Sequence, residues 1–240
     1  MTDIGSIAWK EWRELLGQRG FRGKQGIVLF IATFGIVLPW QTGSAWVTSP
    51  AILVGWSWIP MFLVTTVIAD AFAGERERHT LETLLASRLS DRAILFGKIG
   101  AAIGYSFAVT TASLFAGLLT VNLAHPREGL LLYDLNTVLA MAVLGLLGAV
   151  FVAAVGVLIS LRAATVKVAQ QALAGTIMVL LLAVVGILRG IPTTWKHQLL
   201  PDAVSVARLG ILALVIFAVL DAGAVALALL RFRRSRLIAE

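Results

Sequence analysis

The feature that most constrains this chain is a run of 45 residues, positions 25–69, that contains no charged side chain. A helix of about 20 residues is enough to cross the hydrocarbon core of a bilayer. The run is therefore long enough for two membrane spans. A cluster of turn-forming residues between Pro39 and Pro50 marks the place where the chain reverses. We expect the first span over residues 26–46 and the second over residues 51–72.

The composition of the whole chain agrees with a membrane protein. Hydrophobic residues make up 59% of the sequence and charged residues 14%, and the mean hydropathy is +0.91. A soluble domain of this size does not carry so apolar a composition. Four further apolar stretches predict spans at 93–122, 135–161, 168–188 and 205–230. The predicted fold class is an all-α membrane protein with six transmembrane helices in one transmembrane domain, residues 1–240.

The basic residues predict the orientation of the chain in the membrane. The net charge is +7, and the lysines and arginines gather beside the apolar spans rather than on one separate domain. The segments on one side carry 5, 5, 2 and 4 basic residues, 16 together, whereas the two on the other side carry 1 and 3, 4 together. The positive-inside rule then places both termini in the cytoplasm. The charge indicates contact with membrane lipids and not with nucleic acid.

Two segments outside the spans have features of their own. In residues 1–24, Trp9, Trp12 and Leu16 share one helical face, which predicts an amphipathic interfacial helix with its indole rings at headgroup depth. A frayed basic tail is the alternative. Residues 189–208 contain Pro192 and Pro201 and are too long for a simple turn.

The loop between the second and third spans is polar and has a helical pattern. Leu81, Leu84 and Leu85 fall on one face, and Glu75, Arg78 and Glu82 fall on another. We expect a short amphipathic helix over residues 74–91 at the membrane surface. A solvated charged turn is the alternative, although a plain turn needs no stripe of leucines.

This loop resembles the cytoplasmic loop of ABC-2 type ABC transporter permeases. The matching residues are Asp70, Ala71, Ala73, Gly74, Glu75, Arg76, Glu77, Thr80, Leu81, Glu82, Leu84, Leu85, Gly97 and Lys98. Arg88 departs from the pattern, because a proline is common there. In the family, this loop holds the coupling helix, which sits in a groove of a separate ATPase.

The resemblance implies a permease subunit of an ATP-driven exporter in a bacterial or archaeal cytoplasmic membrane. It implies two copies of an ABC ATPase, which carry the ATP and Mg, and a second permease chain as a homodimer or heterodimer partner. This chain itself would bind no cofactor. By the same resemblance, residues 1–24 are an elbow helix and residues 189–208 an extracellular or re-entrant element. The implied ATPase-coupling residues are Glu75, Arg76, Glu77, Arg78, Thr80, Leu81, Glu82, Leu84 and Leu85.

Motifs for catalysis are missing from the sequence. Gly97-Lys98 lacks the GxxxxGK[ST] spacing of a phosphate-binding loop. The chain has no cysteine, and its three histidines form no HExxH pair, so a metal site is not expected. Asp70 and Asp221 lack the sequence context of intramembrane aspartyl proteases, and no GxSxG-type motif is present for a serine enzyme. We therefore expect a transporter subunit and not an enzyme.

Asp221 is an acidic residue in the middle of the predicted last span. It lies ten residues before Arg231, about 15 Å along a helix axis. It is either a point in the translocation pathway, as a cation or proton site, or a helix-packing residue. Asp70 lies at the inner end of its span, where Arg76, Lys98 or water can compensate its charge. An ATP-independent secondary transporter that uses Asp221 is the alternative function, and a membrane scaffold is a weaker one. The few polar side chains in the spans favour an amphiphilic substrate.

Overall fold

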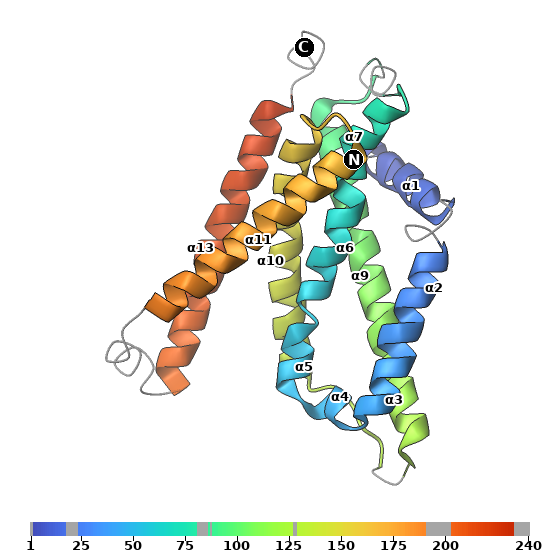
Figure 1. Ribbon diagram of the computed structural model, residues 1–240, viewed down its shortest axis with the longest axis vertical. Helices are drawn as coiled ribbons and strands as arrows, with labels where there is room; N and C mark the ends of the chain where they lie inside the picture. Colours follow the sequence, from blue (N-terminus) through green and yellow to red (C-terminus); the bar gives the residue numbers. More distant parts are fainter. Residues whose placement is uncertain are drawn as a thin grey trace.

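The computed structural model describes residues 2–17, 24–80, 86, 88–126, 129–190 and 203–232, and every regular element in these ranges is a helix. Figure 1 shows long helices that run side by side, with the N-terminal helix α1 (Thr2–Gly17) lying at an angle across one end. The predicted all-α class is confirmed for this part of the chain.

The first predicted span consists of α2 (Lys24–Ala32), the π-helix η1 (Thr33–Val37) and α3 (Leu38–Thr42). These three segments follow one another without a break and form a candidate span over Lys24–Thr42. In η1, the carbonyl of Gly35 accepts a hydrogen bond of 2.9 Å from the Thr120 hydroxyl of α9 (Asp91–Ala124). A Cβ added at Gly35 would lie 2.8 Å from Ala116 Cβ. The glycine thus permits close contact between the two helices.

The second span is longer than predicted. After the short helix α4 (Ala45–Thr48), the chain returns through α5 (Pro50–Gly55), α6 (Trp58–Ile68) and α7 (Asp70–Glu77). These three form one candidate span over Pro50–Glu77, which extends beyond the predicted end at residue 72. The residues up to Glu77 therefore continue the helices of the second span, and the loop begins after them.

The third and fourth spans are the single helices α9, with 34 residues, and α10 (Leu135–Ser160), with 26 residues. Side chains cap both helices. The Ser90 hydroxyl accepts from the Ala93 amide, and the Asp134 carboxylate accepts from the amide and hydroxyl of Thr137. The hydrogen bonds from Thr137 hold the pKa of Asp134 below its usual value. These two spans lie where the sequence predicts them.

The described residues contain four candidate membrane spans, and the six-span layout stays a prediction. The helices α11 (Val166–Gly190) and α13 (Ala203–Arg231) occupy the positions of the predicted fifth and sixth spans. The predicted element at 189–208 overlaps the last residues of α11 and the first residues of α13. Its middle, residues 191–202, lies outside the described residues.

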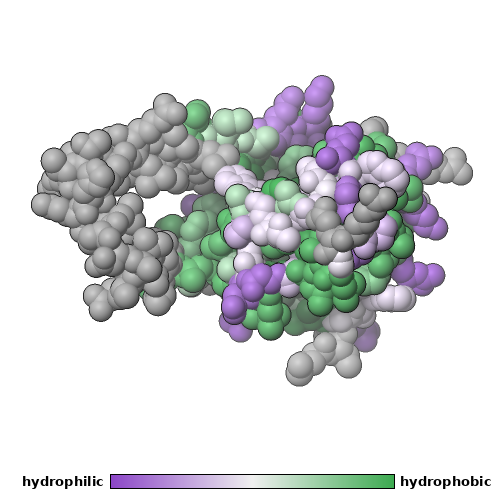
Figure 2. Space-filling model, turned by 90° about the horizontal axis from the view of Figure 1, so that it is seen from below, coloured by the Kyte–Doolittle hydropathy of each residue, from purple (hydrophilic) through white to green (hydrophobic). Residues whose placement is uncertain are grey.

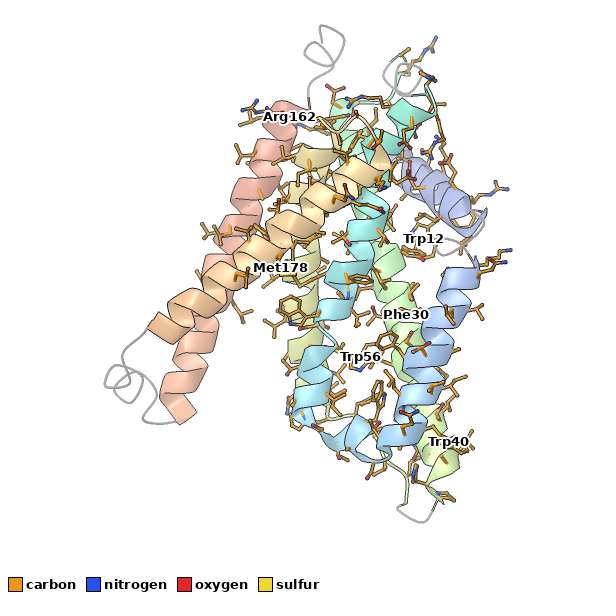
Figure 3. The ribbon with its side chains drawn as sticks, viewed as in Figure 1. Trp12, Phe30, Trp40, Trp56, Arg162 and Met178 are labelled. Carbon is orange, nitrogen blue, oxygen red and sulfur yellow. The ribbon has the colours of Figure 1, made fainter. Side chains whose placement is uncertain are left out.

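The N-terminal helix α1 packs against the beginning of α9. Ile7 lies against Gly97, where an added Cβ would come 2.7 Å from the Ile7 side chain. The Trp12 indole N–H donates to the Ala101 carbonyl at 3.2 Å, and Figure 3 shows Trp12 between the two helices. Trp9 is 66% exposed. Of the two tryptophans predicted to lie at headgroup depth, Trp12 thus faces the protein, because its indole N–H is bonded to α9.

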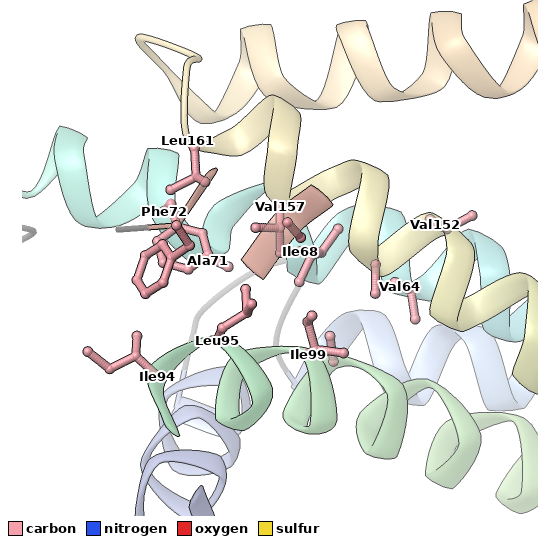
Figure 4. Close-up of a cluster of buried hydrophobic side chains, with 14 of the residues drawn as sticks. Val64, Ile68, Ala71, Phe72, Ile94, Leu95, Ile99, Val152, Val157 and Leu161 are labelled. Carbon is pink, nitrogen blue, oxygen red and sulfur yellow. The ribbon is translucent and has the colours of Figure 1, made fainter. Parts of the chain in front are cut away.

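The largest core cluster joins α6, α7, α9 and α10 near the end that contains α7. Figure 4 shows Ile68 and Phe72 from the second span facing Leu95 from α9 and Val157 from α10. All four side chains are fully buried. Tight contact between α6 and α10 requires small residues on α10, and a Cβ added at Gly156 would overlap the Ile68 side chain.

The two ends of the molecule differ in what they contain. The helix α1, the end of α7, the α10–α11 turn with Arg162 and the last turn of α13 lie at the same end (Figures 1 and 3). Figure 2 views the molecule from the opposite end, where hydrophobic and weakly polar side chains form most of the described face and strongly hydrophilic ones lie mainly along its rim. Exposed apolar side chains there include Leu123 and Leu130, each 80% exposed.

A substitution tests the close contact between α6 and α10. Gly156→Ala should lower the free energy of unfolding by about 1–3 kcal/mol, because the added methyl group meets a fully buried branched side chain. Gly175→Ala in α11 is the matched control, since an added Cβ there has no heavy atom within 4 Å. Thermal unfolding in detergent measures both variants. Equal stability of the two would contradict the packing described.

Candidate functional site

The polar end of the molecule is organised around the last turn of α7. This helix ends at Glu77, because Arg78 leaves the helical conformation and His79 has a φ of 56°. The His79 amide donates to the Arg76 carbonyl at 3.1 Å, and the Thr80 amide donates to the Glu75 carbonyl at 2.9 Å. These two bonds form a Schellman motif, which terminates a helix. The single helix predicted over residues 74–91 is therefore corrected, since the helix that contains Glu75 stops at Glu77.

Glu75 is buried in a charge cluster. The Lys98 ammonium of α9 lies 2.6 Å from a carboxylate oxygen of Glu11 and 3.3 Å from one of Glu75. The Lys98 side chain is 2% exposed, and its ammonium lies 5.6 Å from the centre of the Phe72 ring. The Thr80 hydroxyl also donates to the Glu75 carboxylate. One buried lysine thus joins α1, α7 and α9.

Arg76 and Glu77 point to a different neighbour, the turn between α10 and α11. The Arg76 guanidinium donates to the Leu161 carbonyl at 2.7 Å and to the Ala163 carbonyl at 2.6 Å. The Glu77 carboxylate accepts from the Val166 amide at 3.0 Å. Val166 is the first residue of α11, so this carboxylate caps the positive end of that helix.

A buried serine fixes the junction between α6 and α7. The Ser160 hydroxyl, at the end of α10, accepts from the amides of Phe72 and Ala73 at 3.2 and 3.0 Å. It donates to the Ala69 carbonyl at 3.0 Å. A side chain inserted into the backbone bonds of a helix is a known cause of a break in that helix. Ser160 explains why α6 ends at Ile68 and α7 begins at Asp70.

Asp70 has a partner that the sequence did not indicate. Its carboxylate lies 3.5 Å from the Arg78 guanidinium, whose side chain is half exposed. We expected Arg76 and Lys98 near Asp70. Instead, Arg76 contacts the α10–α11 turn, and Lys98 contacts Glu11 and Glu75. The two residues are eight positions apart, and both side chains meet beside Gly74, where no side chain separates them.

The predicted coupling residues thus fall into groups. Glu75, Arg76 and Glu77 bond residues of other helices or turns, whereas Arg78 and Thr80 bond Asp70 and Glu75 of α7 itself. Glu77, Arg78 and Thr80 are exposed residues. Leu81, Glu82, Leu84 and Leu85 lie outside the described residues. Sequence reasoning did not find Glu11, Ser160 or the role of Lys98. A lysine six residues inside a predicted span was a signal, because a charge there needs a counter-charge.

The acidic residues of this cluster resemble a cation site in spacing. Ligand oxygens of Glu11, Glu14 and Glu75 lie within 4.8 Å of one another. The Lys98 ammonium already contacts Glu11 and Glu75, and Lys10 pairs with Glu14 at 3.3 Å. Two ammonium groups of the chain itself thus pair with the three carboxylates, and the cluster is an ion-pair network.

Asp221 lies apart from this cluster, on α13 where that helix packs against α10. Its residue is 5% exposed, and both of its carboxyl oxygens are buried without a hydrogen-bond partner among the described residues. Ala224 and Ala228 lie on the same face of α13 and are also buried. One turn earlier, Phe217 contacts Phe151 of α10, with ring centres 5.9 Å apart. The surroundings of Asp221 are apolar.

Apolar helices long enough to cross a bilayer, together with a polar cluster at one end, define a multi-pass membrane protein. Residues 41–226 match the family model described as ABC-2 family transporter protein. The match covers most of the chain, and the chain belongs to this family. No curated protein matches it.

Removal of the lysine tests the charge cluster. Lys98→Met should destabilise the protein by about 3–5 kcal/mol, because the buried Glu75 and the partly buried Glu11 would lose their cation. Lys10→Met is the control, since the Lys10–Glu14 pair is exposed and such pairs contribute about 0–1 kcal/mol. Adding Glu75→Gln to Lys98→Met should recover part of the loss. If Lys98→Met is as stable as Lys10→Met, the cluster does not hold the three helices together.

Replacing Asp221 is expected to raise the stability of the protein, unlike the removal of Lys98. Asp221→Leu should raise the midpoint of thermal unfolding, because a buried carboxyl group without a donor is costly even when it is protonated. Ala222→Leu, at an exposed position of the same helix, should change it little. A decrease in stability for Asp221→Leu would show that the carboxyl group has a partner that stabilises the fold.

Proposed function

We propose that this chain is the membrane permease subunit of an ATP-driven exporter whose ATPase is a separate protein. The family match supports this proposal. The sequence contains no phosphate-binding loop of its own, so hydrolysis falls to a partner. As the family resemblance implies, two ATPase copies carry the ATP and Mg, and a second permease chain completes the transport pathway.

The observation that carries the proposal is the position of the α7 end. It lies at the end of the molecule that also contains α1, the α10–α11 turn and the last turn of α13. In the sequence, the four predicted segments to which these elements belong carry 16 of the 20 basic residues, which favours the cytoplasmic side. The end of α7, from which the loop continues, would then face an ATPase in the cytoplasm. The same reasoning assigns both termini to the cytoplasm. The family resemblance implies a bacterial or archaeal cytoplasmic membrane.

The contacts around α7 divide the roles of the predicted coupling residues. Arg78 and Thr80 are exposed and bond Asp70 and Glu75 of α7 rather than another helix, and Leu81, Glu82, Leu84 and Leu85 follow them in the sequence. We assign contact with the ATPase to these six residues. Glu75, Arg76 and Glu77 are positioning residues, since their side chains attach the loop to α9, α10 and α11. The ATPase drives a conformational change only by binding one permease state more tightly than another.

Asp221 supports a second candidate function. A buried carboxyl group without a donor, ten residues from the end of a long apolar helix, is the kind of group that ion-coupled transporters use. The alternative is therefore a secondary transporter that works without ATP and uses Asp221 as an ion or proton site. Substrate export that persists without ATP and stops in Asp221→Asn would favour this alternative.

Affinity capture from native membranes tests the proposed function. The tagged chain, solubilised in mild detergent, should retain a soluble P-loop ATPase that mass spectrometry identifies. The double variant Leu81→Asp/Leu84→Asp should lose at least nine tenths of this ATPase, because charged groups would replace the leucine face of the loop. Leu130→Asp/Leu132→Asp is the matched control. It alters two exposed leucines at the other end of the molecule, 80% and 66% exposed, and should keep the ATPase.

Both possible failures of this experiment are informative. A folded chain that is recovered without any ATPase would contradict the proposal and favour the secondary transporter. An ATPase that stays bound to the Leu81→Asp/Leu84→Asp variant would show that the contact lies elsewhere.

A further inference from the structure

The α10–α11 turn is attached to α7 by side chains on both sides. We define the α7 clamp as Arg76, Glu77 and Ser160 together with the backbone groups that they bond. The Arg76 guanidinium donates to the carbonyls of Leu161 and Ala163, and the Glu77 carboxylate accepts from the amide of Val166. From the other side, Ser160 bonds the backbone of α7 and of Ala69. The six hydrogen bonds are 2.6–3.2 Å long.

The clamp uses the groups that a helix leaves unpaired at its ends. The carbonyls near the end of α10 and the first amide of α11 have no partner within their own helices. Arg76 and Glu77 supply these partners with charged groups, which form stronger hydrogen bonds than neutral ones. Apolar packing closes the same contact, because Ala69 and Ala73 lie in one buried cluster with Ala163 and Val166. Breaking the clamp would expose unpaired backbone groups and apolar surface together.

We propose that the α7 clamp carries movement of the cytoplasmic loop directly to α10 and α11. The inference rests on the proposed function, in which an ATPase moves this loop. Adjacency in the chain alone would pass such movement to the second span and to α9, the two elements that flank the loop. The clamp adds a second route, to helices about 90 residues further along the chain. Arg76, Glu77 and Ser160 are positioning residues in this scheme, because they touch neither ATP nor the substrate.

The experiment measures whether the two routes can be separated. The chain has no natural cysteine, so single cysteines can be introduced for spin labels. One label pair reports on α11, at Leu119 of α9 and Val179 of α11, which are 48% and 67% exposed. The second pair, Leu119 with Val28 of α2, does not involve α10 or α11. Distances are measured by pulsed electron paramagnetic resonance in the complex with its co-purified ATPase, without nucleotide and with ATP and vanadate.

Four variants test the clamp. Two of them, Val166→Pro and Glu77→Gln, separate the hydrogen bond between Val166 and Glu77 from the charge of Glu77. Val166→Pro removes the backbone N–H that donates a hydrogen bond to the Glu77 carboxylate. Proline is well suited to the first position of a helix. The Thr165 hydroxyl accepts from the Val168 amide at 3.2 Å, as an N-terminal capping residue does, which places Val166 at that first position. Glu77→Gln keeps an acceptor oxygen but removes the charge. Arg76→Ala with Glu77→Ala removes both side chains, and Lys10→Ala with Glu14→Ala removes an exposed ion pair as the control.

We expect the nucleotide-dependent change in the Leu119–Val179 distance to fall at least twofold in Val166→Pro and in the double alanine variant. The Leu119–Val28 change should stay the same in every variant, and the control should behave as the unsubstituted chain. Glu77→Gln, which keeps an acceptor oxygen but not the charge, should lose less of the Leu119–Val179 change than Val166→Pro. A purely structural role would lower stability without separating the two distance changes. If the ATPase is bound and the Leu119–Val179 change persists in both Val166→Pro and the double alanine variant, the inference is wrong and the proposed function stands. If no ATPase is recovered, the proposed function fails and this inference fails with it.

Discussion

The arrangement of the polar end depends on one buried ammonium group. Lys98 lies near the beginning of α9, is 2% exposed, and contacts Glu11 of α1 and Glu75 of α7. A charge removed from water requires partners of opposite sign, and these partners come from two other elements. The position of α1 across the end of the bundle and the buried position of α7 both follow from this requirement. The loop after α7 therefore starts from a fixed point.

Small residues let the polar contacts form. Gly97 makes room for α1 on α9, and Gly156 makes room for α6 on α10. With α10 so close to the second span, the hydroxyl of Ser160 reaches the backbone at Ala69 and Phe72. The polar contacts at the helix ends thus depend on close apolar packing along the spans. In a membrane, where apolar helices gain little by leaving lipid, both kinds of contact are needed to define a single structure.

Much of the fold could be predicted from the sequence, because the length of an uncharged run and the positions of basic residues obey simple limits set by the bilayer. The candidate site was predicted less well. Helical periodicity assigned Glu75 to a polar face but did not identify Lys98 as its partner, since that pairing depends on how helices pack. The end of α7 was missed because His79 adopts a positive φ, which the sequence does not signal as a glycine would. Ser160 gave no signal, because a serine at a helix end is common.

The measurement that tests the central claim most directly is the side of the membrane on which the loop after α7 lies. Two single-cysteine variants are made at exposed positions, Ala86→Cys in the loop after α7 and Leu130→Cys between α9 and α10. Each variant is treated with a membrane-impermeant maleimide. The account predicts that Leu130→Cys reacts in intact cells and that Ala86→Cys reacts only after the membrane is opened. Reaction of Ala86→Cys in intact cells would place the loop away from ATP and would contradict the account.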